Sequence, residues 1–236
     1  MEEKVAKFMN KKLSFDCIVI GGGLSGLTAT LALSKIGLSM AIIDKTSLKM
    51  VKKNEGDQRT TAVSASGKKI FEALDVWDSL KEDAEPILDI VVSEKGKRGH
   101  LNFDHQTVGT EPMGHILDNI QLKNSLISSI SSQKNIQLFP FKSLNNFFPD
   151  TGAVTVDLND GTSYEAALLV AADGRNSAGR RIAKIKDTNI NYNQSSIVFT
   201  VSHEKPHKGT AYEQFTTGGP IAFLPMRGNQ SSVVWS

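Results

Sequence analysis

The sequence predicts an α/β protein in which a parallel, nucleotide-binding layer is interleaved with a second layer of antiparallel strands. Three observations predict this fold class. A glycine-rich loop joins an apolar run to a helical segment near the N-terminus. A second apolar run, at residues 166–172, has the length of a buried strand, and short alternating strands dominate from Tyr192 onward.

The first strand and helix carry a dinucleotide fingerprint. Gly21, Gly23 and Gly26 match G-x-G-x-x-G directly after the apolar run Phe15–Ile20, and they open a helical segment at residues 24–36. The first glycine allows a tight turn, the second lets a pyrophosphate approach the backbone, and the third lets helix and strand pack closely. The helix N-terminus then points free N–H groups at the phosphates. The loop therefore predicts a Rossmann-like βαβ unit.

A second strand follows this helix and ends on an acidic residue. Asp44 lies 18 residues after Gly26, close to the spacing at which a carboxylate hydrogen-bonds a ribose hydroxyl. Strand, loop, helix, strand and acid together predict a dinucleotide site. They do not separate NAD from FAD.

The next segment passes from a polar loop into a helix. Ser64 or Ser66 is placed to cap this helix. Five large apolar residues then recur at helical spacing and are expected in the core: Ile70, Phe71, Leu74, Trp77 and Leu80. After Pro86, strand-like stretches at 87–94 and 100–105 flank a Gly/Lys turn, which predicts a β-hairpin.

The middle of the chain predicts a helix at 119–132 and several strands. The turn Asn159-Asp160-Gly161 separates two of these strands and is typical of a hairpin. Residues 166–172 are apolar throughout, so we expect a strand that is covered on both faces. We also expect this strand to lie in the same sheet as residues 15–20.

Charge and cysteine content exclude several function classes. The chain has 27 basic and 25 acidic residues, and its net charge of +2 gives no reason to expect nucleic acid as a partner. Cys17 is the only cysteine, which excludes a disulfide framework and any multi-cysteine metal site. Its place in the first strand predicts a buried, inert thiol.

The sequence indicates a cytoplasmic protein. The N-terminus has no apolar segment of the secretory type, and no apolar run approaches the roughly 20 residues that span a bilayer. Two interpretations of the first residues stay open, a solvated end and contact with the periphery of the inner membrane, because lysines there flank two apolar residues: Lys4, Lys7, Lys11, Lys12, Phe8 and Met9.

The stretch "HEKPH", His203 to His207, matches the H-E-x-x-H string of zinc proteases. That motif works only on a helix, where both histidines share a face. Pro206 lies inside it and strand patterns flank it, so we expect a hairpin loop without metal. No metal site is predicted elsewhere.

Three further stretches, taken with the glycine loop, carry a resemblance to a known family. They are "DQRTTAVSASGKKIFEALDVW", "LLVAADGRNS" and "AYEQFTTGGPIAFLPM". In this order they resemble the FAD-dependent aromatic hydroxylases of the p-hydroxybenzoate hydroxylase type, and most closely the branch that hydroxylates polyprenylated phenols in ubiquinone biosynthesis. The resemblance covers almost the whole chain and indicates FAD as the cofactor.

The resemblance implies which residues hold FAD. The loop positions Gly21, Gly23, Leu24, Ser25 and Gly26 would take the pyrophosphate, and Asp44 with Lys45 the adenosine end. Asp44 stands where the family most often has Glu.

In the same way, Arg59 would face the phosphate loop instead of solvent, Asn119 would lie near the ribityl chain, and Asp173 with Gly174 would close the back of the site. Plainer roles stay open for these side chains: an exposed loop arginine, a helix N-cap and a strand-end turn, respectively.

The resemblance also implies the domain organisation and the reaction. An FAD-binding domain would comprise residues 1–85 and 117–185, and substrate-domain strands residues 86–116 and 186–236. The flavin, reduced by NAD(P)H, would use O₂ to hydroxylate a lipophilic phenol, with a ubiquinone-biosynthesis complex at the membrane surface as a further partner. No catalytic acid, base or nucleophile is predicted.

Several aromatic and apolar strand residues are candidates for the substrate pocket, although core packing is the favoured interpretation: Phe199, Tyr212, Phe215, Phe223 and Leu224. Two other classes of function stay open. One is a non-catalytic FAD-binding remnant, and the other, disfavoured by the antiparallel strands after residue 186, is an NAD-dependent dehydrogenase.

The sequence departs from the family pattern at its end. These enzymes carry a G-D motif beyond the substrate strands, and this sequence stops before any such segment. A fragment and a truncated product both stay open. We expect the chain alone to bind FAD weakly and to turn over little, and we expect the last strand, "SSVVWS", to leave an unpaired edge or an uncovered face.

Overall fold

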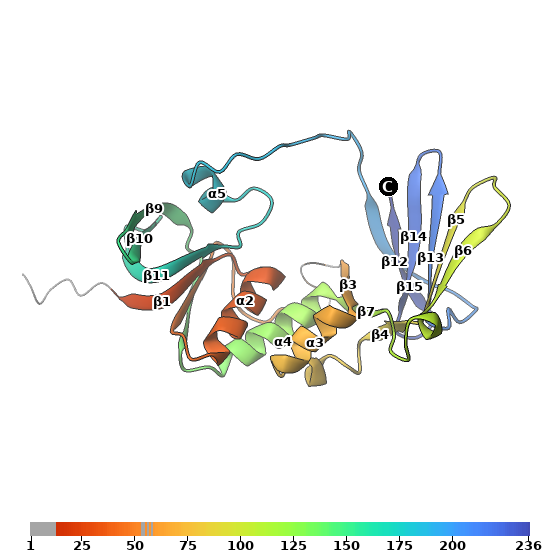
Figure 1. The fold of residues 1–236 in the computed structure, drawn as a ribbon, viewed down its shortest axis with the longest axis horizontal. Coiled ribbons are helices and arrows are strands. Elements are labelled where there is room, and N and C mark those ends of the chain that lie inside the picture. The colour runs from red at the N-terminus through yellow and green to blue at the C-terminus, as the bar shows by residue number, and fades with distance from the viewer. Residues whose placement is uncertain (1–12, 53–54, 56, 58) are drawn as a thin grey trace, which may run out of the picture. The chain divides into compact units, whose positions relative to one another are not determined.

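A computed structural model describes residues 13–52, 55, 57 and 59–236. The chain divides into two compact units, each built from two segments (Figure 1). The first unit comprises Met1–Met50 and Leu126–Thr188, and the second comprises Val51–Ser125 and Asn189–Ser236. The basic N-terminal residues singled out in the sequence lie outside the described part of the chain.

The described part of the first unit contains one six-stranded sheet in the order β8-β2-β1-β11-β10-β9. Its strands and helices are β1 (Ser14–Ile20), α2 (Leu24–Lys35), β2 (Met40–Asp44), β8 (Ile136–Pro140), β9 (Leu144–Asp150), β10 (Ala153–Leu158), β11 (Ser163–Ala171) and α5 (Ala178–Ile182). Helix α4 (Asn119–Ser131) begins in the second unit and ends in the first.

Four neighbouring strands of this sheet, β8, β2, β1 and β11, run parallel. The register between β1 and β11 pairs Phe15 with Ala166 and Ile20 with Ala171. The prediction that the late apolar strand returns to the first sheet is therefore confirmed. Strands β10 and β11 form the predicted hairpin, with Gly161 at φ +82° in its turn.

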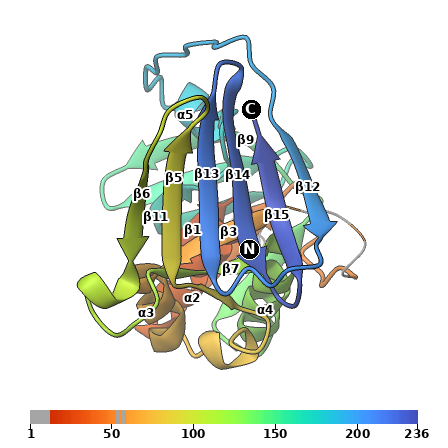
Figure 2. The ribbon, with the colours of Figure 1, turned by 90° about the vertical axis from the view of Figure 1, so that its right-hand side faces the viewer.

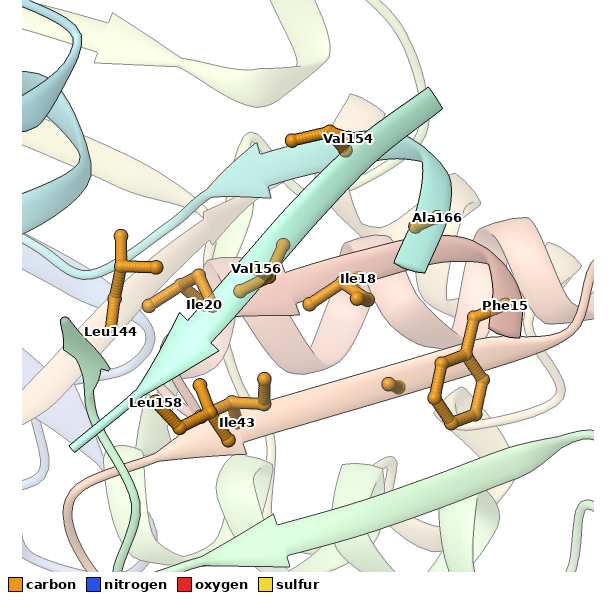
Figure 3. Packing of buried hydrophobic residues seen from close by; sticks show 10 residues of the cluster. Phe15, Ile18, Ile20, Ile43, Leu144, Val154, Val156, Leu158 and Ala166 are labelled. Carbon is orange, nitrogen blue, oxygen red and sulfur yellow. The ribbon is translucent and has the colours of Figure 1, made fainter. Parts of the chain in front are cut away.

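One core cluster of the first unit lies on one face of its sheet. Ile18, Ile43 and Val156 are fully buried there and pack with other apolar residues (Figure 3). The β-branched residues of β1 and β2 suit a pleated strand that is packed on its faces. Cys17 is completely buried beside them, as predicted, and burial raises the pKa of its thiol to about 11.

One prediction about β11 is wrong. Leu168 is 49% exposed, and Ala167 and Ala171 are also exposed, so the strand is not covered on both faces. Only Ala166 is buried in the core cluster. An uninterrupted apolar run is compatible with a strand that is covered on both faces, but it does not require one. Whether each face of the strand is covered depends on which other segments of the chain pack against it.

The described part of the second unit contains two sheets, shown from the front in Figure 2. The larger has the order β12-β15-β14-β13-β5-β6 and is antiparallel except where β5 and β13 pair in parallel. The smaller has the order β3-β7-β4. The elements are β3 (Thr60–Ser64), α3 (Ala65–Ala73), η1 (Trp77–Ser79), β4 (Glu85–Ile87), β5 (Asp89–Glu94), β6 (His100–Asp104), η2 (His105–Thr107), β7 (Gly114–Asp118), β12 (Ile197–Ser202), β13 (Thr210–Thr216), β14 (Gly219–Met226) and β15 (Gln230–Trp235).

Helix α3 begins as predicted. The Ser64 hydroxyl accepts a hydrogen bond from the Gly67 N–H at 3.1 Å and caps the helix. Phe71 and Trp77 are buried, but Ile70, also predicted in the core, is 52% exposed. The helix ends at Ala73, so Ile70 lies on its outer face, while the later apolar residues belong to the turn and the short η1 helix.

The stretch from His203 to His207 is a loop, as predicted, but not a hairpin. It connects β12 to β13, and β15 and β14 lie between those two strands in the sheet. The His207 ring binds the loop in place: its Nδ1 accepts the Gly209 N–H at 3.0 Å, and its Nε2 lies 2.8 Å from the Met226 carbonyl oxygen. Both histidines therefore have structural hydrogen bonds.

The last strand, β15, is paired on both sides, with β12 and with β14. Of the two outcomes expected for "SSVVWS", the unpaired edge does not occur. Ser232 and Val233, which point to opposite faces, are 2% and 1% exposed, so the uncovered surface is limited to the strand ends, where Trp235 is 50% exposed. Across the described residues, we find no helix with the length and apolar character needed to cross a membrane.

Candidate functional site

The candidate nucleotide site of the first unit lies where its parallel strands end. A cavity of about 490 Å³ is lined by residues that directly follow β1, β2 and β11, and by the segment after β8: Gly21, Gly23, Lys45, Lys142, Ala172 and Asp173 among others. The chain leaves β1 for β2 on one side and reaches β11 on the other. Ligands of open α/β sheets bind at such a switch point, outside the carboxyl ends of the strands.

Two glycines of the fingerprint are required by close packing. Gly21 has φ +111°, and a Cβ placed on it would lie 2.3 Å from the Ala172 carbonyl oxygen. A Cβ on Gly26 would lie 1.9 Å from the Gly21 carbonyl oxygen. No side chain fits at either position, so these glycines let the loop, the helix and β11 approach one another.

Gly23 differs from the other two glycines. Its backbone is extended, at φ −76° and ψ 176°, and a Cβ there would meet nothing within 4 Å. Gly23 is the N-cap of α2, and no side chain caps the helix. The first-turn N–H groups therefore face open space, which is the arrangement that binds phosphate oxygens. The loop and cavity fit a dinucleotide pyrophosphate.

Asp44 connects the end of β2 to this loop. One carboxylate oxygen, Oδ2, accepts the Gly22 N–H at 2.6 Å, and the other, Oδ1, accepts the Thr46 N–H at 2.7 Å. The carboxylate thus lies at the cavity with a fixed orientation. Oδ1 also accepts the Thr46 hydroxyl at 2.5 Å, so the carboxylate is held from the glycine loop and from the residue two positions further on.

Cations gather at the same cavity. Lys45, Lys142 and Arg181 all line it. Lys142 Nζ lies 2.7 Å from Asp160 Oδ2, and hydrogen bonding to that carboxylate raises the pKa of Lys142. Lys45 was predicted from the sequence, whereas Lys142 and Arg181 were not. The sequence signal for Lys142 was its position just after β8, because the residues that follow parallel strands lie together at one edge of the sheet.

Asp173 organises the far side of the cavity. Its Oδ1 accepts the Ser177 hydroxyl at 2.5 Å, and its Oδ2 accepts the Ala178 N–H at 2.6 Å. Burial raises the pKa of Asp173, but these hydrogen bonds, with one from the Gly179 N–H, outweigh it and lower the pKa overall. The carboxylate caps α5, while Gly174 beside it lines the cavity.

In the second unit, Arg59 and Asn119, both named from the sequence, meet in one network with Asp57. Arg59 donates from Nε and Nη2 to the two oxygens of Asp57, each at 2.7 Å. Asn119 Nδ2 donates to Asp57 Oδ2 at 2.8 Å, and Asn119 Oδ1 accepts the Thr61 hydroxyl. The hydrogen bond from Arg59, followed by that from Asn119, holds the pKa of Asp57 well below its usual range.

Arg59 is more exposed than expected. Its side chain is 69% exposed, and that of Asp57 is 38% exposed, so the ion pair lies at the surface of the described residues. The Arg59 guanidinium is therefore exposed to solvent, because the Asp57 carboxylate that binds it also lies at the surface. The roles of Arg59 and Asn119 toward a cofactor stay predictions.

A second cavity, of about 300 Å³, lies beside this network within the second unit. Asp57 and Asp118 contribute to it from one side, and the larger sheet contributes Thr200, Met226 and Gln230. Of the five strand residues proposed from the sequence as pocket-lining or core, only Leu224 packs against a core cluster. The four aromatic residues are 38–49% exposed, so core packing is wrong for them: Phe199, Tyr212, Phe215 and Phe223.

Comparison with known proteins agrees with this geometry. A family model described as an FAD binding domain matches residues 14–236. The chain belongs to this FAD-binding domain family. The family's cofactor is FAD, whose pyrophosphate and adenosine ribose suit the open helix N-terminus and the acidic strand end described above.

Ubiquinone hydroxylases are among the similar sequences. The chain is 34% identical over 221 residues to the ubiquinone hydroxylase UbiL of Rhodospirillum rubrum, covering 94% of this chain and 51% of that protein. It is 27% identical over 218 residues to the 3-demethoxyubiquinol 3-hydroxylase of Escherichia coli, covering 92% of this chain and 56% of that protein. The chain thus spans about half the length of these relatives.

Solved structures show the same fold. A p-nitrophenol 4-monooxygenase, PnpA of Pseudomonas putida, superposes with a TM-score of 0.79 at 16% identity, covering 94% of this chain and 58% of that chain. PqsL of Pseudomonas aeruginosa in complex with 2-aminobenzoylacetate gives 0.80 at 18% identity, covering 94% and 60%. The Rossmann-like layer with an interleaved strand-rich layer, predicted from the sequence, is confirmed.

Proposed function

We propose that this chain is part of an FAD-dependent monooxygenase that hydroxylates the aromatic ring of a polyprenylated phenol in ubiquinone biosynthesis. NAD(P)H is the proposed reductant, and O₂ supplies one oxygen atom to the ring and one to water. The observation that carries the proposal is the cavity at the strand ends, where a helix N-terminus without a side-chain cap meets the Asp44 carboxylate. The similarity to two hydroxylases of ubiquinone biosynthesis supports the substrate class.

The residues of the first unit have defined roles in this proposal. N–H groups from Gly23, Leu24, Ser25 and Gly26 bind the pyrophosphate, while Gly21 makes the turn that exposes them. Asp44 and Lys45 hold the adenosine end. Asp173 with Gly174 shapes the opposite wall by capping α5.

The residues of the second unit are proposed to act on the flavin. Bound flavin supplies the redox chemistry and the activation of O₂. Arg59 offers planar donors to the cofactor, and Asp57 keeps that guanidinium in one orientation. Asn119 is held by Asp57 and Thr61, so its amide is positioned before any ligand arrives. The carboxylates, Thr200 and Gln230 around the second cavity give a phenol hydroxyl polar partners.

The proposed place of action is the cytoplasm at the periphery of the inner membrane, in a ubiquinone-biosynthesis complex. A polyprenylated phenol is lipophilic, so an enzyme for it must reach substrate from a membrane surface. The proposed domains are the FAD-binding residues 1–85 and 117–185, and the substrate-domain residues 86–116 and 186–236.

The experiment measures binding and turnover separately. FAD is titrated into purified protein while flavin fluorescence is followed, and Asp44→Ala is compared with Asp75→Ala, a surface acid of the second unit. We expect saturable FAD binding that Asp44→Ala weakens and Asp75→Ala preserves. NAD(P)H oxidation is then measured with and without a short-chain 2-polyprenylphenol, and product is identified by mass spectrometry. FAD binding with little phenol-dependent product would agree with the expectation that this chain alone turns over little, whereas the absence of saturable FAD binding would refute the cofactor site.

A further inference from the structure

One buried histidine of the second unit takes no part in the sites described above. His115 lies in β7, paired with Val63 of β3 on one side and with Pro86 of β4 on the other. It is only 9% exposed, and its Nδ1 is buried with no hydrogen-bond partner among the described residues. Buried polar atoms in folded proteins are normally hydrogen-bonded, so an imidazole at this position departs from ordinary core composition.

An aromatic ring and a cation lie around this imidazole. The rings of Trp77 and His115 meet edge to face, with their centroids 5.0 Å apart and their planes at 72°. Lys68 Nζ lies 5.6 Å from the centroid of the Trp77 ring. The same ammonium lies 3.5 Å from a carboxylate oxygen of Glu72 and 3.5 Å from one of Glu111. A proton on His115 would therefore add a second cation to a largely buried site that already holds Lys68.

The charged groups around His115 act on it in opposite directions. Burial lowers the pKa of His115, and the positive charge of Lys68 lowers it further. The carboxylates of Glu111 and Glu72 raise this pKa but do not offset the first two effects, so the net direction is down. The fold therefore favours the neutral imidazole.

The other elements beside His115 contribute no such charge. Its two partners in the small sheet, Val63 and Pro86, are uncharged. The acidic residue of η1, Asp78, has a side chain that is 89% exposed and that pairs with Lys81 at 3.0 Å. The balance of Lys68 against two glutamates thus determines how readily this histidine is protonated in the folded chain.

The direction of the pH dependence follows from this balance. In the unfolded chain His115 takes up a proton near the ordinary histidine pKa of about 6.5, whereas the folded chain takes it up only at a lower pH. The neutral side chain thus stabilises the fold fully above pH 6.5, and this stabilisation is lost as the pH falls through 6.5 toward the folded pKa.

The small sheet connects His115 to the network around Asp57. Strand β7 leads directly into Asn119, and β3 begins directly after Arg59. The Asn119 N–H donates to the Arg59 carbonyl oxygen at 3.0 Å, and both side chains bind Asp57. The pairing of β3 with β7 continues from this point to His115. A change of packing at the histidine therefore reaches the network through two paired strands.

We propose that His115 is a pH-sensitive switch through which protonation loosens the Asp57 network. When the imidazole gains a proton at mildly acidic pH, α3 and η1 separate from β7, because the new cation is repelled by Lys68 and requires water. The pairing of β3 with β7 then weakens, and Arg59 and Asn119 lose their fixed positions. The switch lies within the second unit, and its test needs neither flavin nor substrate.

The first experiment measures the proton. The Cε1 proton of His115 is followed by NMR in the full chain between about pH 8 and pH 5 and is assigned by its absence from His115→Phe. We expect a titration midpoint below 6.5. Lys68→Met should move this midpoint upward because it removes the neighbouring cation, whereas Lys69→Met, at an exposed lysine of the same helix, should leave it unchanged.

The second experiment measures the opening. In a Trp235→Phe background, Trp77 is the sole tryptophan and is 8% exposed. Between about pH 7.5 and pH 5.5 we expect a reversible red shift of its emission and stronger quenching by acrylamide. His115→Phe retains an aromatic ring against Trp77 but cannot gain a proton, so both changes should disappear. His100→Phe, at an exposed histidine of β6, should respond like the parent.

Hydrogen exchange tests the connection to the network. Peptides that contain residues 59–64 and 114–119 are compared at the same two pH values, after correction for the pH dependence of chemical exchange. Because opening takes up one proton, the open fraction should rise by up to about tenfold per pH unit below 6.5. The faster exchange should be absent from His115→Phe and from His115→Gln, a second variant without a titrating group in case the first does not fold.

Three results would overturn the proposal. The first is a midpoint of 6.5 or above for the parent protein, or a midpoint that Lys68→Met leaves unchanged. The second is a Trp77 response that persists in both variants of His115, which would assign the opening to another group. The third is a Trp77 response that depends on His115 while exchange in residues 59–64 and 114–119 stays constant, which would separate the histidine from the network.

Discussion

Replacing Gly23 with alanine separates binding from folding at the glycine loop. The backbone of Gly23 is extended at φ −76°, and an added Cβ meets no atom within 4 Å. The folded state therefore accepts the methyl group without strain. Because alanine has less freedom than glycine in the unfolded chain, the substitution gains about 0.4–1 kcal/mol, but alanine is less favourable than glycine at an N-cap by a similar amount. The free energy of unfolding should therefore change by less than about 1 kcal/mol.

The same methyl group should damage FAD binding. It occupies space over the uncapped N-terminus of α2, through which a phosphate oxygen must pass to reach the N–H groups. A hydrogen bond to a charged group contributes about 1.5–3 kcal/mol, so the loss of one weakens FAD binding by roughly 10- to 150-fold.

The assay is a fluorescence titration of FAD with a thermal melt of each protein. Gly109→Ala is the matched control, since a Cβ at Gly109 also meets nothing within 4 Å, and Gly109 belongs to the second unit and does not line the cavity. We expect Gly109→Ala to bind FAD like the parent protein. If Gly23→Ala binds FAD with parental affinity, the loop does not hold the pyrophosphate. A loss of more than about 2 kcal/mol in the free energy of unfolding of Gly23→Ala would refute the packing argument instead, because it exceeds what an N-cap contributes.

Three further predictions concern stability and reactivity. Gly26→Ala should lower the free energy of unfolding by about 1–3 kcal/mol or prevent folding, because its Cβ would lie 1.9 Å from the Gly21 carbonyl oxygen; a thermal melt equal to the parent's would contradict this. Asp173→Asn should remove about 1–2 kcal/mol at pH 7 by weakening the cap of α5. The pKa of Asp173 is lowered in the folded state, so the ionised carboxylate stabilises the fold above the unfolded pKa of about 3.9, and this stabilisation is lost as the pH falls. In urea unfolding, the difference in free energy of unfolding between parent and Asp173→Asn should therefore shrink toward about pH 3. A difference that stays constant with pH would exclude the ionic contribution. Cys17 should resist an aromatic disulfide reagent at pH 8 until urea unfolds the protein, because it is fully buried and its pKa is raised to about 11; rapid labelling of the native protein would show that the first strand opens.

The nucleotide-binding unit shows how far local sequence determines structure. The strand–loop–helix from Ser14 to Lys35 and the acidic end of β2 were predictable because each depends on short-range rules: glycine at the turn, apolar residues in the strands and a carboxylate at the fixed spacing. The Ser64 cap was predictable for the same reason, since a hydroxyl three residues before the Gly67 N–H is enough to form it. Arg59 and Asn119 were named from the sequence through resemblance, and the structure adds the hydrogen bonds by which both bind Asp57.

Tertiary structure alone decided the features that depend on which strands become neighbours. Lys142 and Arg181 line the cavity because β8 lies beside β2 and α5 follows the end of β11. No local sequence pattern predicts that these elements become neighbours of the site. The exposure of Leu168 and of the four aromatic residues of the larger sheet has the same origin: strand period determines which residues share a face, but only the packing of distant segments determines whether that face is covered. The sequence by itself therefore determined the nucleotide fingerprint and its strands, whereas the fold decided which apolar residues became core and which remained exposed.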